Sequence, residues 1–177
     1  MKIFNIIFQV IIFGTLTGSI VSICSVGFVL GVENISKPMN LGNLIRSAHA
    51  FGANSVFTIS PHKRVVENKD KINKSDTSKS VNHLPYYEWD KINDISIPRG
   101  CKIIGIEITE DAEDLQNFVH PLQAMYILGP EKGSLSSETL LKADHIVKIP
   151  TSFSLNVAIA GAIVMYDRIK TLGIKTR

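Results

Sequence analysis

Three polar loops of this chain carry residue types and spacings that could do chemistry. In the first, Asn40 precedes a segment with helical periodicity that contains Arg46, on the side away from the apolar arc. A guanidinium offers a rigid fork of donors, which suits an anion or a hydroxyl group. We expect Asn40 to cap this helix. The alternative interpretation of Arg46 is a solvated arginine on a surface helix.

The second loop, residues 128–133, has the sequence Leu-Gly-Pro-Glu-Lys-Gly and follows an apolar run. Gly129, directly after a buried strand, would let a ligand approach the backbone amides closely. Glu131 could accept hydrogen bonds from ligand hydroxyls or from nearby backbone N–H groups. The alternative is an ordinary strand-to-helix turn that Ser136 or Ser137 caps.

The third loop, residues 149–157, follows another apolar run, which ends at Pro150. Ser154 and Asn156 would lie at the positive end of a helix that begins near Leu155. Such an end favours a negatively charged or polar group of a ligand. Simple capping of the helix by Ser154 is the alternative.

Several common site types are missing from the sequence. There is no GxGxxG after the first strand, no P-loop lysine motif, no HExxH and no GxSxG. Hydride transfer, nucleotide hydrolysis and triad hydrolysis therefore lack support. The 2 cysteines have no CxxC or Cys/His spacing, and no two of the 5 histidines have metal-ligand spacing on a helix. We therefore expect neither a metal site nor a disulfide framework.

The elements that must position these loops alternate along the chain. Short apolar runs predict strands at 28–32, 55–60, 102–107, 124–128 and 145–149. Helical spacing predicts helices at 40–51, 112–118, 136–143 and 155–172, with a loop or weak helix at 61–80. Because strands and helices alternate, the sequence predicts an α/β fold, a parallel sheet flanked by helices. Ligands of such sheets bind beyond the carboxyl ends of the strands, where the three loops lie.

Composition and charge indicate one folded domain and allow an anionic partner. The 177 residues are 45% hydrophobic and 20% charged, which excludes a disordered tail. The formal net charge is +3. Salt-dependent substrate binding is predicted from the basic residues of 63–79 and from Arg168, Lys170, Lys175 and Arg177. The alternative is a solvated basic surface.

The amino terminus does not match the rest of the chain, because no charged residue occurs from Ile3 to Val32. Lys2 and the apolar run that follows it have the outline of a signal peptide or a membrane anchor. Gly, Thr and Ser residues dilute the run and no small-x-small cleavage site follows, so a non-native or misassigned leader is the other interpretation. We divide the chain into a hydrophobic leader, 1–26, and a domain, 27–177.

In this order and spacing, the three loops resemble the SpoU/TrmH branch of the SPOUT superfamily of RNA methyltransferases. The resemblance rests on Asn40-x-Gly42-x-x-x-Arg46-x-Ala48, on Leu128-Gly129-Pro130-Glu131-x-Gly133, and on Ile149-Pro150 with Ser154-Leu155-Asn156-Val157-Ala158. It also includes residues 47–53 and Asp76-Thr77-Ser78-Lys79, and it covers Gly27 to Lys170.

This resemblance implies S-adenosylmethionine (S-adenosyl-L-methionine) as methyl donor and the ribose 2′-hydroxyl of tRNA or rRNA as acceptor. It implies a C-terminal deep trefoil knot and a homodimer with the active site at the interface. A cytoplasmic location follows, with membrane association only through residues 1–26. The alternatives are a non-catalytic RNA-binding relative of the same fold and, from the leader alone, a membrane-associated small-ligand protein.

The resemblance also implies roles for single residues. Arg46 would help to activate the ribose hydroxyl, and the catalytic set would be Arg46, Asn40, Ser154 and Asn156. The implied cofactor-binding set is Ile106, Glu107, Leu128, Gly129, Glu131, Gly133, Ile149, Pro150, Ser154, Leu155 and Asn156. Because a ribose hydroxyl is a very weak acid, a guanidinium that stabilises the developing oxyanion fits this chemistry, and no metal is needed. Ala158 stands where many relatives have serine, so this site has one hydroxyl fewer.

Overall fold

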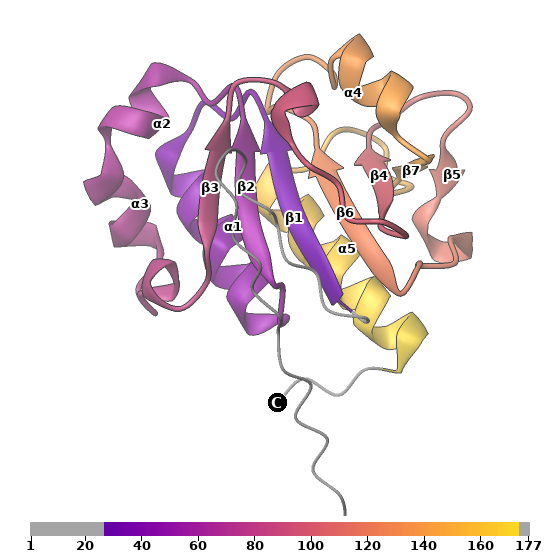
Figure 1. Ribbon diagram of the computed structural model, residues 1–177, viewed down its shortest axis with the longest axis horizontal. Coiled ribbons are helices and arrows are strands. Elements are labelled where there is room, and N and C mark those ends of the chain that lie inside the picture. The colour runs from indigo at the N-terminus through magenta and orange to yellow at the C-terminus, as the bar shows by residue number, and fades with distance from the viewer. Residues whose placement is uncertain (1–26, 174–177) are drawn as a thin grey trace, which may run out of the picture.

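The computed structural model describes residues 27–173 and contains a parallel β-sheet flanked by helices (Figure 1). The sheet has seven strands in the order β3-β2-β1-β6-β4-β7-β5, and every neighbouring pair is parallel. The strands are β1 Gly27–Glu33, β2 Ser55–Ile59, β3 Tyr86–Trp89, β4 Lys102–Ile106, β5 Glu113–Asp114, β6 Gln123–Leu128 and β7 His145–Lys148. The predicted parallel α/β architecture is therefore confirmed.

The helices and 3₁₀ turns connect these strands. The helices are α1 Pro38–Ala50, α2 Lys63–Glu67, α3 Lys69–Ser75, α4 Ser137–Lys142 and α5 Val157–Leu172. The 3₁₀ turns are η1 Ser80–Asn82, η2 Ile92–Asp94 and η3 Leu115–Asn117. In Figure 1, α1 and α5 lie behind the central strands, and α2 and α3 lie beyond the β3 edge.

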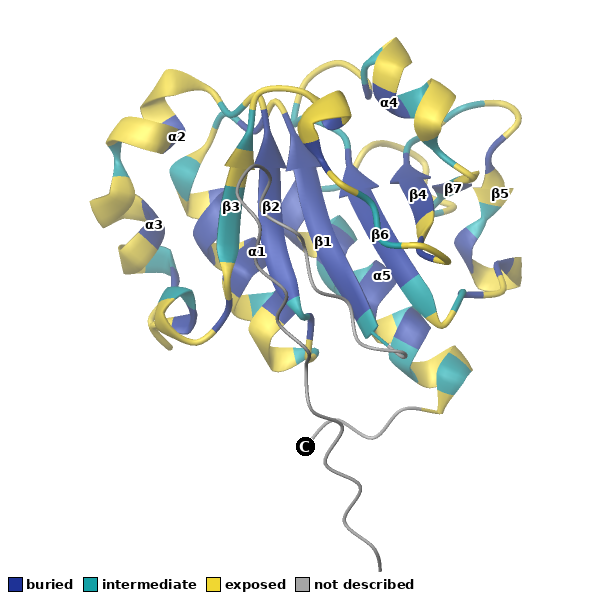
Figure 2. Ribbon diagram, in the orientation of Figure 1, coloured by how far each residue is buried: buried dark blue, intermediate teal, exposed yellow. Residues whose placement is uncertain are grey.

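The core has one cluster on each face of the sheet, because alternate residues of a strand point to opposite faces. Leu30 and Val32 of β1 pack in the cluster that contains α1 and α5. Val29 belongs to the opposite cluster, together with Ile92 and Ile95 from the segment between β3 and β4. Figure 2 shows the central strands buried and the β3 edge only partly so. Burial on both faces explains why the central strands are continuous apolar runs in the sequence.

Both long helices begin at other residues than the spacing predicted. Lys37 is the N-cap residue of α1 and Pro38 occupies its first turn, so the prediction that Asn40 caps this helix is wrong. Proline suits a first helical position, because its missing N–H would have no partner there. The N-cap residue of α5 is Asn156, whose side chain accepts from the N–H of Ala158 at 2.9 Å. The N-cap residue of α4 is Ser136, one of the two serines named in the alternative interpretation of the second loop, and it accepts from the N–H of Thr139.

The segment predicted as a helix at 112–118 instead forms β5 and η3. Ala112, Leu115 and Phe118 are buried at three-residue spacing. Only Leu115 of these three lies in the 3₁₀ turn, so burial at this spacing does not require a helix here. β3 was not predicted, and residues 63–75, predicted as a loop or weak helix, form α2 and α3.

Arg168 is completely buried, although the sequence analysis placed it among exposed RNA-binding residues. Its Nη1 donates to the carbonyl of Pro121 at 2.5 Å, and its Nη2 donates to the carbonyls of Leu122 at 2.8 Å and Gly27 at 3.2 Å. The guanidinium thus joins α5 to the amino-terminal ends of β1 and β6. It cannot contact RNA, and Lys175 and Arg177 lie outside the described residues.

Within residues 27–173, no helix has the length and apolarity that crossing a bilayer requires. The predicted leader, 1–26, lies outside the described residues.

Candidate active site

The loops after β4, β6 and β7 meet because these strands are neighbours in the sheet and their carboxyl ends share one edge. Together they enclose a cavity of about 390 Å³, within the range of small-molecule sites. The predicted residues that line it are Ile106, Glu107, Leu128, Gly129, Glu131, Gly133, Ile149, Ser154 and Leu155. Pro150 and Asn156 do not line it, and neither do Asn40 and Arg46.

The cavity also has lining residues that the sequence analysis did not select: Ile108, Pro130, Lys132, Lys148, Thr151, Val157 and Ala160. Most of them are sequence neighbours of a selected residue, so the predicted strand ends already indicated the segments in which they lie. Lys148 is the last residue of β7, and its ammonium donates to the carbonyl of Thr109 at 3.4 Å. Across residues 27–173, no three His, Cys, Asp or Glu side chains gather as metal ligands would.

Two carboxylates fix the loop that follows β6. Glu107 accepts from the backbone N–H of Leu135 at 2.8 Å and from its neighbour Ile108 at 2.9 Å. Glu33, at the end of β1, accepts from the N–H of Ser136 at 2.9 Å. Glu33 is 4% exposed and was not predicted to act here. The sequence did contain a signal for it, because Glu33 is a charged residue at the end of a buried apolar strand and so needs a partner.

Gly129 lies directly against one of these carboxylates. A Cβ atom at this position would lie 3.0 Å from Oε2 of Glu107 and 3.7 Å from the backbone nitrogen of Leu135. The first distance is below ordinary van der Waals contact. A side chain here would press on the carboxylate that holds the loop, so the absence of a side chain at Gly129 keeps the cavity in shape.

A chain of side-chain hydrogen bonds joins the loop after β6 to the starts of α1 and α5. The amide nitrogen of Asn40 donates to Oε1 of Glu131 at 2.9 Å, and its oxygen accepts from Asn156 at 3.1 Å. The other carboxylate oxygen of Glu131 accepts from the N–H and the hydroxyl of Ser36, each at 3.0 Å. Asn40 and Asn156 therefore act together with Glu131, beside the cavity and not in its lining.

These bonds determine the charge state of Glu131. Its partial burial raises the pKa, but the hydrogen bonds from the N–H of Ser36 and the amide of Asn40 lower it by more, so the pKa of Glu131 lies below its ordinary value of 4.5. The carboxylate is thus ionised at neutral pH, as a fixed acceptor.

Arg46 lies in a different hollow from the cavity. It is exposed on α1 and lines a groove of about 700 Å³ between α1 and α5. The other lining residues are Asn43, Ser47, Asn156, Ala158, Ile159, Ala162, Ile163 and Tyr166. The Nη1 of Arg46 donates to the hydroxyl of Thr77 at 2.5 Å. Asn156 lines this groove too, and its hydrogen bond to Asn40 connects the groove to Glu131 and the cavity.

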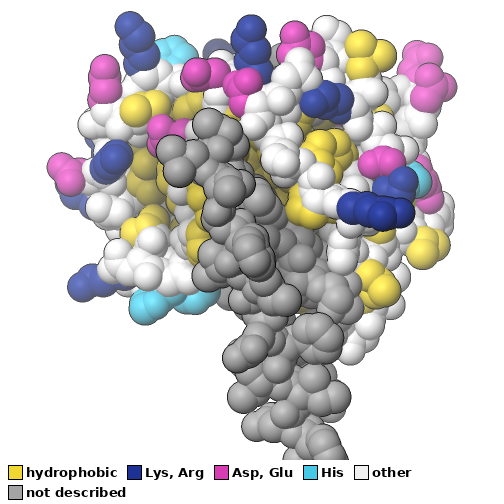
Figure 3. Space-filling model, in the orientation of Figure 1, with side chains coloured by type: hydrophobic (Ala, Val, Ile, Leu, Met, Phe, Trp, Pro, Cys, Tyr) yellow, Lys and Arg dark blue, Asp and Glu magenta, His cyan; other side chains and the backbone are white. Residues whose placement is uncertain are grey.

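The basic stretch at 63–79 lies beyond the β3 edge. Lys69, Lys71 and Lys74 are exposed there on and around α3. On the face that Figure 3 shows, lysine and arginine side chains stand apart among acidic ones and form no continuous basic patch. Charge alone therefore does not mark an RNA path on that face.

Sequence comparison connects this geometry to known proteins. The sequence model of the SpoU rRNA Methylase family matches residues 27–166. Among curated proteins, the chain is 25% identical over 146 residues to a putative TrmH family tRNA/rRNA methyltransferase, YacO, of Bacillus subtilis, with 79% of this chain and 57% of that protein covered. It is 26% identical over 139 residues to a tRNA (guanosine(18)-2′-O)-methyltransferase of Thermus thermophilus, with 77% of this chain and 71% of that protein covered.

Solved structures share the fold. The SpoU methyltransferase AviRb of Streptomyces viridochromogenes, in complex with the cofactor AdoMet, matches with a TM-score of 0.75 at 20% identity, over 86% of this chain and 63% of that one. A structure described as insights into the 2-OH methylation of C/U34 on tRNA matches with a TM-score of 0.72 at 23% identity, over 84% of this chain and 97% of that one.

Proposed function

The chain belongs to the SpoU rRNA methylase family, as the resemblance of its three loops predicted, and we propose that it transfers a methyl group from S-adenosylmethionine to a ribose 2′-hydroxyl of tRNA or rRNA. The observation that carries this proposal is the chain of hydrogen bonds from Glu131 through Asn40 to Asn156. It links a ligand-sized cavity to the helix that presents Arg46. The Thermus relative, named as a 2′-O-methyltransferase, supports the ribose as acceptor.

The residues around the cavity fit S-adenosylmethionine. Ile106, Leu128 and Leu155 offer apolar surface for a flat base. Gly129 leaves its backbone open to the ligand, and Glu107 and Glu131 keep lone pairs for hydroxyl or ammonium donors, because each carboxylate oxygen can accept more than one hydrogen bond. When bound, this cofactor supplies an electrophilic methyl group on a sulfonium centre.

Arg46 is the residue that we assign to the acceptor. Its guanidinium presents donors to the groove, so it stabilises the negative charge that develops on the ribose oxygen. Holding the oxygen in line with the methyl group supplies the remainder of the rate. Ala158 lines the same groove and offers no hydroxyl, so the acceptor is held without a side-chain donor at that position.

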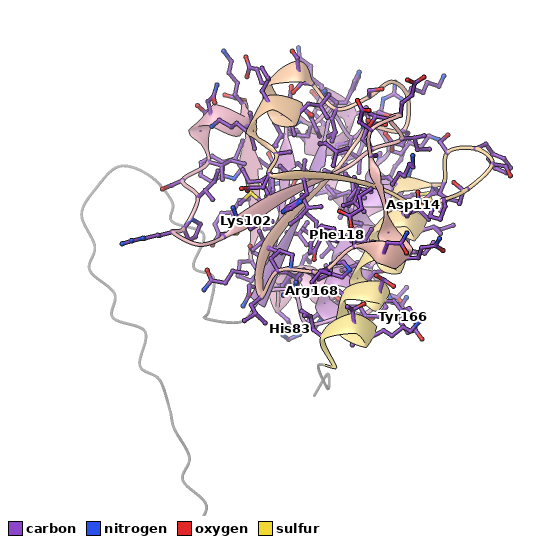
Figure 4. All side chains as sticks on the ribbon, turned by 90° about the vertical axis from the view of Figure 1, so that its right-hand side faces the viewer. His83, Lys102, Asp114, Phe118, Tyr166 and Arg168 are labelled. Carbon is purple, nitrogen blue, oxygen red and sulfur yellow. The ribbon has the colours of Figure 1, made fainter. Side chains whose placement is uncertain are left out.

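A homodimer would complete the site, because one chain keeps Arg46 and the cavity in separate hollows. Ile159 and Tyr166 of α5 are 55% and 61% exposed beside the groove. Figure 4 shows Tyr166 pointing away from the fold and Arg168 pointing into it, from the same helix. A helix that is apolar on its outer side as well needs a second contact. We assign that contact to the α5 of a second subunit.

The trefoil knot belongs to the same proposal. β7 lies on the far side of β4 from β6, yet α5 returns to contact Asn40 and the start of β1. We infer that the returning chain passes through the loop at 129–136, which would produce the knot. A crystal structure tests this. If the traced backbone path can be drawn straight by pulling its two ends apart, the chain has no knot.

The substrate class supports a cellular location, and the family match, which begins at residue 27, supports the domain boundary. We propose that residues 27–177 form the methyltransferase domain and act in the cytoplasm, where tRNA and rRNA are found, with any membrane contact confined to 1–26. Membrane fractionation of chains with and without residues 1–26 tests this division.

The decisive experiment maps 2′-O-methyl sites in total RNA from cells with and without this protein. A site that is lost without the protein, and restored by the purified parent but not by Arg46→Ala, supports the proposal. Cofactor binding without any methyl transfer would favour the non-catalytic RNA-binding relative.

A further inference from the structure

One stripe of α1 is in contact with the segment from α3 to η1. Gly42, Arg46 and His49 follow one another at spacings of four and three residues, so they share a helix face. A side chain at Gly42 would collide with the carbonyl of Ile72, in the middle of α3, and with the hydroxyl of Ser75 at its end. At the other end of the stripe, Nδ1 of His49 lies 3.0 Å from the hydroxyl of Ser80. The Arg46 contact is the middle one of the three.

The turn opposite Arg46, residues 76–79, is itself firmly held. Asp76 is 1% exposed, and its Oδ2 accepts from the N–H of Val81 at 3.0 Å. The N–H of Asp76 donates to the carbonyl of Ile72, and its carbonyl accepts from the N–H of Lys79, both at 3.0 Å. Lys79 has a φ of 53°, a left-handed conformation that a non-glycine residue keeps only when its surroundings fix it.

The hydroxyl of Thr77 in this turn serves as an anchor for Arg46. It accepts from Nη1 at 2.5 Å, while Thr77 does not line the groove that Arg46 lines. Thr77 therefore contacts the guanidinium from outside the groove. Nη2 and Nε of Arg46 have no hydrogen bond to a side chain of the described residues, and they remain as donors for the groove.

We propose that Thr77 is a positioning residue for Arg46: it fixes the guanidinium so that the free donors face the acceptor oxygen. This inference rests on the proposed function and adds a residue to it. An exposed arginine has many rotamers, and a donor stabilises a transition state well only when it is oriented beforehand. The turn keeps its own bonds through Asp76, so the hydroxyl of Thr77 is free to act on Arg46 alone.

The test uses Thr77→Val, which keeps the shape of the side chain and removes its hydroxyl. Methyl transfer from labelled S-adenosylmethionine is measured on total RNA from cells that lack the protein. We expect kcat to fall about 10²-fold, as for other small misplacements of a catalytic group, with KM for RNA and cofactor affinity unchanged. Thr77→Ser should restore kcat, and Ser78→Ala, at the exposed neighbouring position, should leave it at the parent value.

A double variant separates positioning from general damage. If Thr77 acts only through Arg46, then Thr77→Val should cause no further loss of kcat in the Arg46→Ala background. Parent-like kcat in Thr77→Val, or equal losses in both backgrounds, would overturn the proposal and leave the methyltransferase function standing.

A second readout does not depend on activity. NMR relaxation of the Nε–Hε group of Arg46, assigned by its absence in Arg46→Ala, should show a more ordered guanidinium in the parent than in Thr77→Val. If the parent methylates no RNA, the proposed function fails, and this comparison alone decides on Thr77. Equal order in the two proteins would overturn the positioning role.

Discussion

Asn40 and Glu131 are 91 residues apart in the chain, and the amide of the first donates to the carboxylate of the second at 2.9 Å. The bond joins the first turn of α1 to the loop after β6. Because Asn40 also accepts from Asn156, one uncharged side chain sets the distance between two loops of the site. A charge on Glu131 is what makes this arrangement favourable, since a carboxylate only accepts.

Glu131→Gln should therefore lower stability in a pH-dependent way. The folded-state pKa of Glu131 lies below 4.5, so its ionised form contributes stability above that pH, and the contribution is lost as pH falls towards the folded-state pKa. Urea denaturation from pH 7 down to pH 3.5 should show parent and variant far apart at neutral pH and converging below pH 4.5. A constant difference across that range would contradict the assignment of the charge.

Arg46→Ala should reduce methyl transfer by about 10²–10³, the usual cost of losing one oriented charge-stabilising donor. Cofactor affinity should remain at the parent value, because Arg46 lines the groove and not the cavity. Calorimetric titration with S-adenosylmethionine is the control. Equal loss of cofactor affinity and activity would point to a structural role for Arg46.

Gly129→Ala should weaken cofactor binding about tenfold, equivalent to about 1.4 kcal/mol. The added methyl group would lie 3.0 Å from the Glu107 carboxylate, which must move and release the N–H of Leu135. Titration of the cofactor measures the change, and circular dichroism checks that the fold is retained. Parent-like affinity would mean that the Glu107 carboxylate can move without changing the shape of the cavity.

Arg168→Lys should lower the free energy of unfolding by about 3 kcal/mol, because it leaves buried carbonyl oxygens without donors at about 1–3 kcal/mol each. A lysine has no planar fork and cannot reach Gly27, Pro121 and Leu122 together. Lys170→Ala, at an exposed position on the same helix, is the matched control and should change stability by no more than about 0.5 kcal/mol. Similar stabilities for the two variants would show that the buried bonds contribute little.

Replacing Lys69, Lys71 and Lys74 by alanine should lower the salt dependence of RNA affinity, by about 0.7 in the log–log slope for each lost phosphate contact. The measurement is RNA binding between low and moderate salt, with Lys142→Ala on α4 as a control outside the stretch. An unchanged slope in the triple variant would remove α3 from the RNA-binding surface.

The sequence predicts the central sheet well because its strands are apolar on both faces. β1 and β6 are continuous apolar runs, and the loops that follow such runs hold most of the cavity lining. β3 escaped prediction because, as a partly exposed edge strand, it includes Glu88 and lacks the apolar run. β5 has only two residues, too few for any periodicity.

The site residues that escaped prediction depend on tertiary contacts. Thr77 is a polar residue in a polar turn, and only the packing of α3 on α1 brings its hydroxyl to Arg46. Arg168 stands between Asp167 and an exposed helix end, where a solvated arginine is the ordinary expectation. Glu33 has the opposite signal, since a charge at the end of a buried strand needs a partner.

The buried guanidinium of Arg168 stabilises one end of the strands, and the cavity lies at the other end. The guanidinium joins α5 to the amino-terminal ends of β1 and β6, whereas the cavity lies at the carboxyl ends, about 20 Å away along strands of six or seven residues. Substitutions at the two ends of the strands should act almost additively, because additivity holds for sites this far apart. Protein engineers could thus raise the thermal stability of this domain at the amino-terminal ends of the strands while redesigning its substrate preference at their carboxyl ends.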